Sequence, residues 1–375
     1  MPLRVLIVPD KFKGTLTAAA AADAIACGWR AARPGDVLDL LPMSDGGDGF
    51  GEILGQLLGA QAQTVETVDA AHRPLTASWW WHEASATAII ESAGIIGLAK
   101  LPKGKYHPFE LDTRGLGTLL KAAAARGARR CLVGIGGSAT NDAGFGLARA
   151  LGWQFFNAHE EEITRWSELH SLLAVRPPAQ TRMFPDELIV AVDVQNPLLG
   201  PDGCSRVYGP QKGLTEFELA ERCLGQLVGV MEKQLHLCHA AEPGAGAAGG
   251  LGFGLRSFAG ARLEPGFALF AQFAGLDERL RRAQLVITGE GAIDASTLMG
   301  KGTGEIASLC QRLNLPCLGL AGVVPDPARA RTKFAVAHAL APEFTTTEQA
   351  MREPALWLER LAAKAAAEWA GTAPA

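Results

Sequence analysis

The chain has 375 residues, of which 48% are hydrophobic and 20% charged, and its formal net charge is -4. This length fits two domains, and the composition is that of an ordinary globular protein with a sizeable interior. A nucleic-acid-binding protein would normally show a basic face, yet the longest basic cluster is the pair Arg129 and Arg130. Because apolar runs of about 18 residues are also missing from the sequence, we expect neither a nucleic-acid partner nor a membrane span.

The seven cysteines form no CxxC pair and show no metal-site spacing. An odd number of scattered cysteines favours reduced thiols. The opening apolar run is too short for a signal peptide, and its first aspartate, Asp10, comes too early. We therefore expect a cytoplasmic protein, and the sequence is compatible with either a monomer or a homo-oligomer.

Short apolar runs alternate with alanine-rich stretches along the chain, which is typical of a mostly parallel sheet with helices on its faces. Seven runs have the length of buried strands: 4–8, 37–41, 131–135, 188–192, 284–288, 317–321 and 335–339.

Three stretches are predicted to be helical, namely 17–32, 215–235 and 354–370. Thr17 is a plausible N-cap of the first. In the last, an apolar residue recurs every fourth position from Trp357 to Trp369, and these residues should form its buried stripe.

Residues 61–91 differ, because alternating β-type runs there predict antiparallel strands. We therefore predict an α/β protein with two α/β domains. The first is discontinuous, over 1–60 and 280–375, and resembles a Rossmann or flavodoxin-like fold with a mostly parallel sheet. The second, over 61–279, is an inserted mixed α/β domain. The run Trp79–Trp81 is most simply interpreted as a buried strand or an oligomer contact.

Five polar, glycine-bearing loops begin where candidate strands end: PDKFKGT, PMSDGGDG, GIGGSATNDAGFG, DVQNPLLG and GEGAID. In open α/β sheets, ligands lie beyond the carboxyl ends of the strands, so distant loops can form the walls of one site. Helix N-termini after such loops suit phosphate or carboxylate groups. The loops also carry many acids, namely Asp10, Asp45, Asp48, Asp142, Asp193, Glu290 and Asp294. These are too many for anion binding alone, and they indicate Mg²⁺ bridging phosphates together with a base for a hydroxyl nucleophile.

Two glycine-rich motifs resemble known nucleotide-binding motifs, but only weakly. The stretch GAGAAG at 244–249 matches GxGxxG, but it follows a predicted helix rather than a strand. A hinge for domain closure over 244–254, or close helix packing, explains it as well. The stretch MGKGT at 299–303 looks like the end of a P-loop, but Ala295 stands where the first glycine is required.

In order along the chain, the motifs PDKFKGTLTA, SDGGDG, GIGGSATNDAG, DVQNPLLG, GPQKG, GAGAAGGLG and TGEGAID resemble the signature series of the bacterial glycerate kinase family that makes 2-phosphoglycerate. The resemblance runs from residue 9 to about 305. It implies Mg²⁺-dependent transfer of a phosphoryl group from ATP to the 2-hydroxyl of D-glycerate. It also implies two α/β domains without a P-loop, with the active site in the cleft between them. The sequence departs from the family pattern at Lys11 and Asp48 and over 153–186.

The substrate's carboxylate and hydroxyls need cationic or N–H partners and a base near O2. We expect Asp193 or Asp45 to accept the proton, and the remaining polar groups of the opening loops to hold glycerate: Lys13, Ser138, Thr140, Asn141 and Asp142.

The phosphates of ATP need a cation and a close-approaching backbone. Lys212 and the turn Gly289, Glu290 and Gly291 are the candidates for this role. Asp45 and Asp294 are the candidate ligands of Mg²⁺.

Other functions stay open at this point. A dehydrogenase acting on the same hydroxy acid would carry GxGxxG after the first strand, where this chain has PDKFKG. A kinase of another small hydroxy or sugar acid, or of the glycerate 3-hydroxyl, fits the same loops. A non-catalytic metabolite-binding protein is the more distant alternative.

Overall fold

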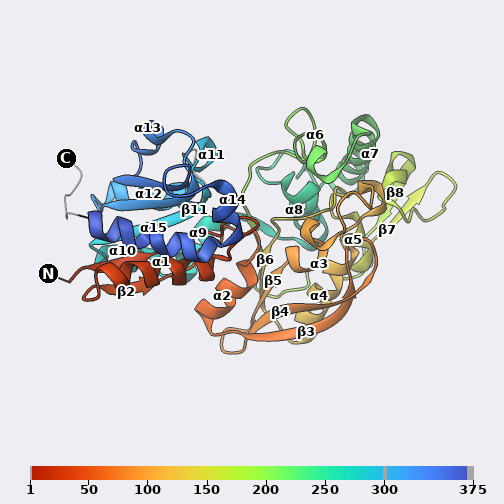
Figure 1. Cartoon of the computed structure of the whole chain (residues 1–375). Coiled ribbons are helices and arrows are strands. Elements are labelled where there is room, and N and C mark those ends of the chain that lie inside the picture. Colours follow the sequence, from red (N-terminus) through yellow and green to blue (C-terminus); the bar gives the residue numbers. More distant parts are fainter. Residues whose placement is uncertain (1, 299–301, 370–375) are drawn as a thin grey trace. The chain divides into compact units, whose positions relative to one another are not determined.

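The computed structural model describes residues 2–298 and 302–369 (Figure 1). The chain divides into two compact units: unit 1 comprises Met1–Asp45 and Phe270–Ala375, and unit 2 comprises Gly46–Leu269. The expected bounds at 60 and 280 differ from this division. Helix α2 (Phe50–Leu58) belongs to unit 2 because its Gly51 packs against the indole of Trp80 in that unit.

Unit 1 is built on one parallel sheet of five strands in the order β13-β12-β11-β1-β2. The strands are β1 (Arg4–Ile7), β2 (Val37–Leu40), β11 (Leu285–Ala292), β12 (Cys317–Val323) and β13 (Val336–Ala341). Both ends of the chain therefore contribute to one sheet. The chain order reverses between β1 and β11, and such a switch point is where open α/β sheets bind ligands.

Helices α1 (Ala18–Ala32) and α15 (Pro354–Glu368) pack side by side in the core of unit 1 (Figure 1). The Oγ1 of Thr17 accepts a hydrogen bond from the Ala20 amide at 3.1 Å, as expected of an N-cap. The buried face of α15 includes Leu358 and Leu361, whereas Trp357 and Trp369 are only half-buried. The prediction of a buried stripe is therefore wrong at Trp357 and Trp369.

The remaining helices that begin after residue 265 are short: α9 (Gly266–Phe273), α10 (Leu276–Arg282), α11 (Ala295–Leu298), α12 (Gly302–Arg312), α13 (Pro327–Ala330) and α14 (Thr347–Arg352). Residues 299–301 of the MGKGT stretch lie outside the described residues.

Unit 2 contains a mixed sheet of six strands in the order β10-β9-β6-β5-β4-β3. Its strands are β3 (Gln61–Val68), β4 (Pro74–His82), β5 (Thr87–Glu91), β6 (Arg130–Gly134), β9 (Glu187–Val192) and β10 (Arg262–Pro265). Strands β3, β4 and β5 pair antiparallel, as the pattern of 61–91 predicts, and β5, β6, β9 and β10 are parallel. Trp79 and Trp81 are buried in the core, which fits the simpler interpretation of the tryptophan run.

Besides short 3-10 helices, the rest of unit 2 comprises the antiparallel pair β7 (Gln154–Asn157) and β8 (Leu172–Arg176) and six further α-helices. They are α3 (Ala93–Ile96), α4 (Arg114–Ala125), α5 (Phe145–Ala150), α6 (Cys204–Tyr208), α7 (Phe217–Leu235) and α8 (Ala247–Ala259). In the described part of the chain, we find no helix with both the length and the apolar character needed to cross a membrane.

The start of α8 fixes the polar loop that follows β6. Gly249 has a left-handed backbone with φ of +72°, and a Cβ there would lie 1.9 Å from the Thr140 carbonyl oxygen. The Ala143 amide also donates to the Gly249 carbonyl at 3.1 Å. Residues 244–254 therefore lie packed inside unit 2, and the expectation of a hinge there is wrong, whereas close packing is correct.

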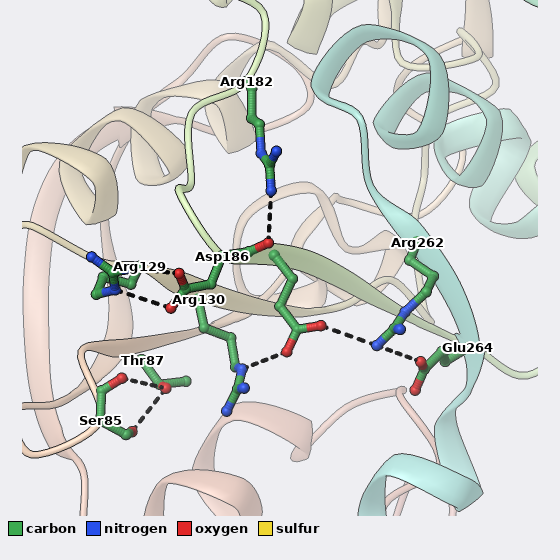
Figure 2. Close-up of polar contacts among 9 residues, drawn as sticks. Ser85, Thr87, Arg129, Arg130, Arg182, Asp186, Arg262 and Glu264 are labelled. Atoms are coloured by element: carbon green, nitrogen blue, oxygen red, sulfur yellow. Dashed lines mark hydrogen bonds and ion pairs between the residues drawn. The ribbon is translucent and has the colours of Figure 1, made fainter.

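Arginine–carboxylate pairs link the amino ends of neighbouring strands in unit 2 (Figure 2). Glu187 at the start of β9 accepts from Arg130 of β6 at 2.6 Å and from Arg262 of β10 at 3.0 Å. Arg129 bonds both carboxylate oxygens of Asp186, at 2.6 and 3.0 Å. These pairs join three strands at the edge opposite to the glycine-rich loops, so they help to fix the strand register that positions those loops.

The contact between α1 and α15 yields a stability prediction at Gly28. A Cβ on Gly28 would lie 1.9 Å from the Glu359 carbonyl oxygen, so the Gly28→Ala variant must separate the two helices. We expect a loss of about 1–3 kcal/mol in the free energy of unfolding, measured by urea denaturation.

Gly229→Ala on α7 is the matched control, since a Cβ there meets open space. It should be neutral or stabilising, by up to about 1 kcal/mol. Equal stability of Gly28→Ala and the natural protein would contradict this account of the helix contact.

Candidate functional site

Three of the polar loops meet at the carboxyl edge of the unit 1 sheet. The Asp10 amide donates to the Gly289 carbonyl at 2.8 Å, which extends the pairing of β1 with β11 beyond β1 itself. Asp10 is thereby held next to Glu290, at the switch point of the sheet. Asp45 follows β2 on the other side of β1 and approaches Gly302, the first residue of α12.

Asp10, Asp45 and Glu290 form an acidic group in which the pKa values of Asp10 and Glu290 are raised. Burial, together with repulsion from Asp45 and Glu290, raises the pKa of Asp10 well above its ordinary value. Burial also raises the pKa of Glu290 to about 7, against the effect of its hydrogen bonds. Carboxyl groups crowded in this way are best satisfied by a cation, which lowers the free energy of their ionised forms.

Glu290 and Asp294 differ in their surroundings. The Thr297 hydroxyl donates to Glu290 Oε1 at 2.8 Å, so this side chain is held in place at one oxygen. The Oδ1 of Asp294 accepts from both the amide and the hydroxyl of Ser296, each at 2.7 Å. Asp294 therefore bonds to the first turn of α11, and this local role is favoured over that of a metal ligand.

The glycines of β11 let neighbouring backbone segments pack closely at this edge. A Cβ on Gly289 would lie 2.1 Å from the Leu320 carbonyl oxygen of β12. A Cβ on Gly291 would lie 3.5 Å from the Lys13 amide nitrogen, so the loop after β1 runs directly beside the end of β11. Lys13 itself is exposed. Phosphate oxygens could approach the backbone here, with a lysine side chain within the same loop.

The donor chemistry at this edge fits Mg²⁺, which prefers oxygen ligands and is usually bound through one or two carboxylates plus substrate phosphates. Among the described residues, no group of three or more His, Cys, Asp or Glu side chains lies in an arrangement that could hold a metal ion on its own. Asp10, Asp45 and Glu290 are thus suited to a metal that arrives with phosphate ligands.

In unit 2 the GIGGSATNDAGFG loop follows β6 and is folded back on itself. Ser138 Oγ and Thr140 Oγ1 lie 2.9 Å apart, and both side chains are buried. The Asn141 Nδ2 donates to Ser205 Oγ at 2.9 Å. Its Oδ1 is buried and, within the described part of the chain, has no hydrogen-bond partner. Asn141 therefore retains an acceptor that the protein itself does not use.

Lys212 lies behind this loop. Its Nζ donates to the Thr140 carbonyl at 2.6 Å, and burial lowers its pKa to about 8. The lysine places a positive charge next to Thr140 and Asn141, which suits an anionic group bound at the loop.

Asp142 has a structural role within the loop. Its side chain is fully buried and accepts from the Thr113 amide and hydroxyl at 3.0 and 2.8 Å, and from the Gly144 and Gly146 amides at 3.3 and 2.9 Å. Burial raises its pKa to about 6 despite these bonds. With its oxygens thus engaged, Asp142 shapes the loop that carries Asn141.

Asp193 follows β9, the strand next to β6, and its side chain is exposed. Burial and then the charge of Asp193 raise the pKa of Tyr208. The Tyr208 hydroxyl donates to Asn196 Oδ1 at 2.6 Å. Asp193 thus lies at the same carboxyl edge as the 138–142 loop, with a small polar network beside it.

The two expected lysines lie in different units. Within unit 1, the backbone of Lys13 lies beside Gly291, and within unit 2, Lys212 bonds to Thr140. The expected roles of Lys13 at glycerate and of Lys212 at the phosphates stay predictions. Asp10 was counted among the acids of the loops, but it was given no role of its own. Ser205 was not named at all, because nothing in the local sequence marks it.

Comparisons with known proteins agree with this geometry. The model of the glycerate kinase family matches residues 5–370. The chain is 36% identical over 365 residues to a glycerate kinase of Halalkalibacterium halodurans, covering 96% of each chain. It is 36% identical over 329 residues to the glycerate 2-kinase of Escherichia coli, covering 86% of each. A crystal structure from Salmonella typhimurium, assigned as a glycerate kinase 2, matches with a TM-score of 0.82 at 30% identity and 98% coverage of both chains. The chain therefore belongs to the glycerate kinase family.

Proposed function

We propose that the protein phosphorylates D-glycerate at its 2-hydroxyl, using ATP and giving 2-phosphoglycerate and ADP. The observation that carries this proposal is the placement of two complementary polar groups at the carboxyl edges of two sheets. Unit 1 presents crowded carboxylates and the Lys13 loop beside the end of β11, which suit a metal and phosphates. Unit 2 presents Asn141, backed by Lys212, and the exposed Asp193, which suit a small hydroxy acid.

At the nucleotide end, Asp10, Asp45 and Glu290 would hold Mg²⁺. The ion would neutralise charge on the phosphates, and this is its main contribution to phosphoryl transfer. Residues Gly289–Gly291 lie within β11, so the end of that strand, rather than a turn, would face the phosphates, and the adjacent Lys13 adds a cation.

At the substrate end, Asn141 offers its unused Oδ1 to a hydroxyl of glycerate. The buried positive charge of Lys212, which is hydrogen-bonded to the Thr140 carbonyl, attracts the carboxylate of glycerate. Asp193 is the better choice for the base, because Asp45 is already part of the acidic group that suits the metal. Turnover also requires that water be kept away from the reacting phosphate. All seven cysteines are free thiols, which fits a protein that works in the reducing cytoplasm.

The direct test is an ADP-release assay with D-glycerate, ATP and Mg²⁺, followed by phosphorus NMR of the product. Phosphate on the 2-hydroxyl couples to one carbon-bound proton and should give a doublet. A triplet would identify the 3-hydroxyl as the acceptor. Absence of ADP release with D-glycerate and with other small hydroxy acids would leave a metabolite-binding protein and overturn the proposal.

Asp193→Asn tests the base. We expect kcat to fall by about 10²–10⁴, with little change in KM, because a general base acts in the transition state. Asp202→Asn removes the same charge from an exposed position of the same connection and should keep full activity. Turnover of Asp193→Asn at the control's rate would remove Asp193 from the mechanism.

Asp10→Asn tests the acidic group without relying on activity. The raised pKa values mean that native unit 1 holds protons that the unfolded chain has lost, so stability falls as pH rises from about 4 to about 7. At pH 8 without Mg²⁺, the variant should melt about 2–4 °C above the natural protein, because a repulsive charge is gone. At pH 5 the difference should vanish, since the carboxyl groups are then protonated.

Added Mg²⁺ should stabilise the natural protein at pH 8 more than it stabilises Asp10→Asn. Asp23→Asn is the control, because it removes an exposed carboxylate from α1 in the same unit. A variant that melts lower at pH 8, or that responds fully to Mg²⁺, would contradict the assignment of Asp10.

A further inference from the structure

Unit 1 contains a cavity of 520 Å³ that the proposed chemistry has not used. It lies next to the carboxyl end of β13, the edge strand of the parallel sheet. The cavity is lined by the loop 342–346 after β13 and by three residues of the following helices, Thr347 and Gln349 of α14 and Trp357 of α15. Its size falls in the range of small-molecule sites.

The loop that forms the cavity is held in a defined shape. The amides of Phe344 and Thr345 both donate to the Leu340 carbonyl, at 2.9 and 2.7 Å. The Thr346 hydroxyl caps α14 by accepting from the Gln349 amide at 3.2 Å. A loop fixed by its own hydrogen bonds can present a preformed wall to a ligand.

Two aromatic rings line the cavity. Phe344 and Trp357 contact each other edge to face, with ring centroids 6.0 Å apart. The Arg360 guanidinium lies 4.9 Å from the centroid of the Trp357 ring. The Trp357 Nε1 is buried and, among the described residues, has no hydrogen-bond partner. An unsatisfied buried donor is costly, and its occurrence beside a cavity points to an acceptor supplied by a ligand.

The cavity lies at the same edge of the sheet as Asp10 and Glu290. Strands β11 and β13 are separated only by β12. Neighbouring strands are about 4.8 Å apart, so roughly 10 Å separate the acidic group from the end of β13. A ribose with its phosphate chain can extend over such a distance along the edge of a sheet.

We propose that this cavity binds the adenine base of ATP, an inference that rests on the proposed kinase function. The aromatic rings supply apolar surface for a planar base, and the indole N–H supplies a donor for one of its ring nitrogens. The carboxylate of Glu343 is an acceptor suited to the exocyclic amino group of adenine, whereas the 6-oxo group of guanine is itself an acceptor and offers it no hydrogen. ATP is therefore preferred over GTP.

Trp357→Phe tests the site, because it keeps an aromatic ring and removes the donor. The KM for ATP should rise about tenfold, while the KM for D-glycerate stays unchanged. Inhibition by inorganic tripolyphosphate, which has no base, should be the same in the variant and the natural protein. Trp369→Phe is the matched control: Trp369 packs against the same core and does not line the cavity, so its variant should behave as the natural protein.

An unchanged KM for ATP in Trp357→Phe would overturn the site. Inhibition by tripolyphosphate that weakens as much as ATP binding would also overturn it, because this would indicate a general disturbance of unit 1. Photolabelling with 8-azido-ATP, in the absence of glycerate, separates this inference from the kinase function. Label within residues 342–357 supports the site even if D-glycerate is not the acceptor, and label confined to other residues rejects it even if D-glycerate is phosphorylated.

Discussion

The parallel pairing of β1 with β11 is the interaction on which the rest of unit 1 depends. It joins the two ends of the chain, with Val5 opposite Leu285 and Ile7 opposite Ile287. The bond from the Asp10 amide to the Gly289 carbonyl continues this pairing past the end of β1. The backbone therefore holds Asp10 next to Glu290 although burial and mutual repulsion oppose their ionisation. A divalent cation would remove this cost, so the same pairing that builds the sheet prepares a site for a metal.

Unit 2 uses its acidic residues in a different way. Asp142 is fully buried, and its oxygens are taken up by Thr113 and two glycine amides. The carboxylate thereby shapes the turn that presents Asn141, while the exposed Asp193 follows the neighbouring strand. Acids at the carboxyl ends of strands thus fall into two kinds, those that shape a loop and those that face a ligand, and burial with saturated hydrogen bonds distinguishes them.

Much of this arrangement follows from local sequence. Each of the seven apolar runs of strand length lies in a strand, although β2 is only partly buried, and Thr17 predicts the start of α1. The partners of Lys13 and Lys212 could not be predicted, because each depends on which loop a distant strand brings near. Trp357 shows the same limit: its spacing predicts a buried residue, yet the loop after β13 leaves a cavity at its side. The antiparallel pair of strands over 154–176 was also missed, since its short strands lack a clear alternation.

The proposed role of Asp10, Asp45 and Glu290 can be tested by locating the bound metal directly. Crystals grown with Mn²⁺ and a non-hydrolysable ATP analogue would reveal the ion by its anomalous scattering. The account predicts a peak within coordination distance of Asp10 or Glu290 and of the phosphate oxygens, at the carboxyl ends of β1 and β11. A metal–nucleotide complex bound at any other edge of the molecule, with Asp10 and Glu290 left without the ion, would contradict it.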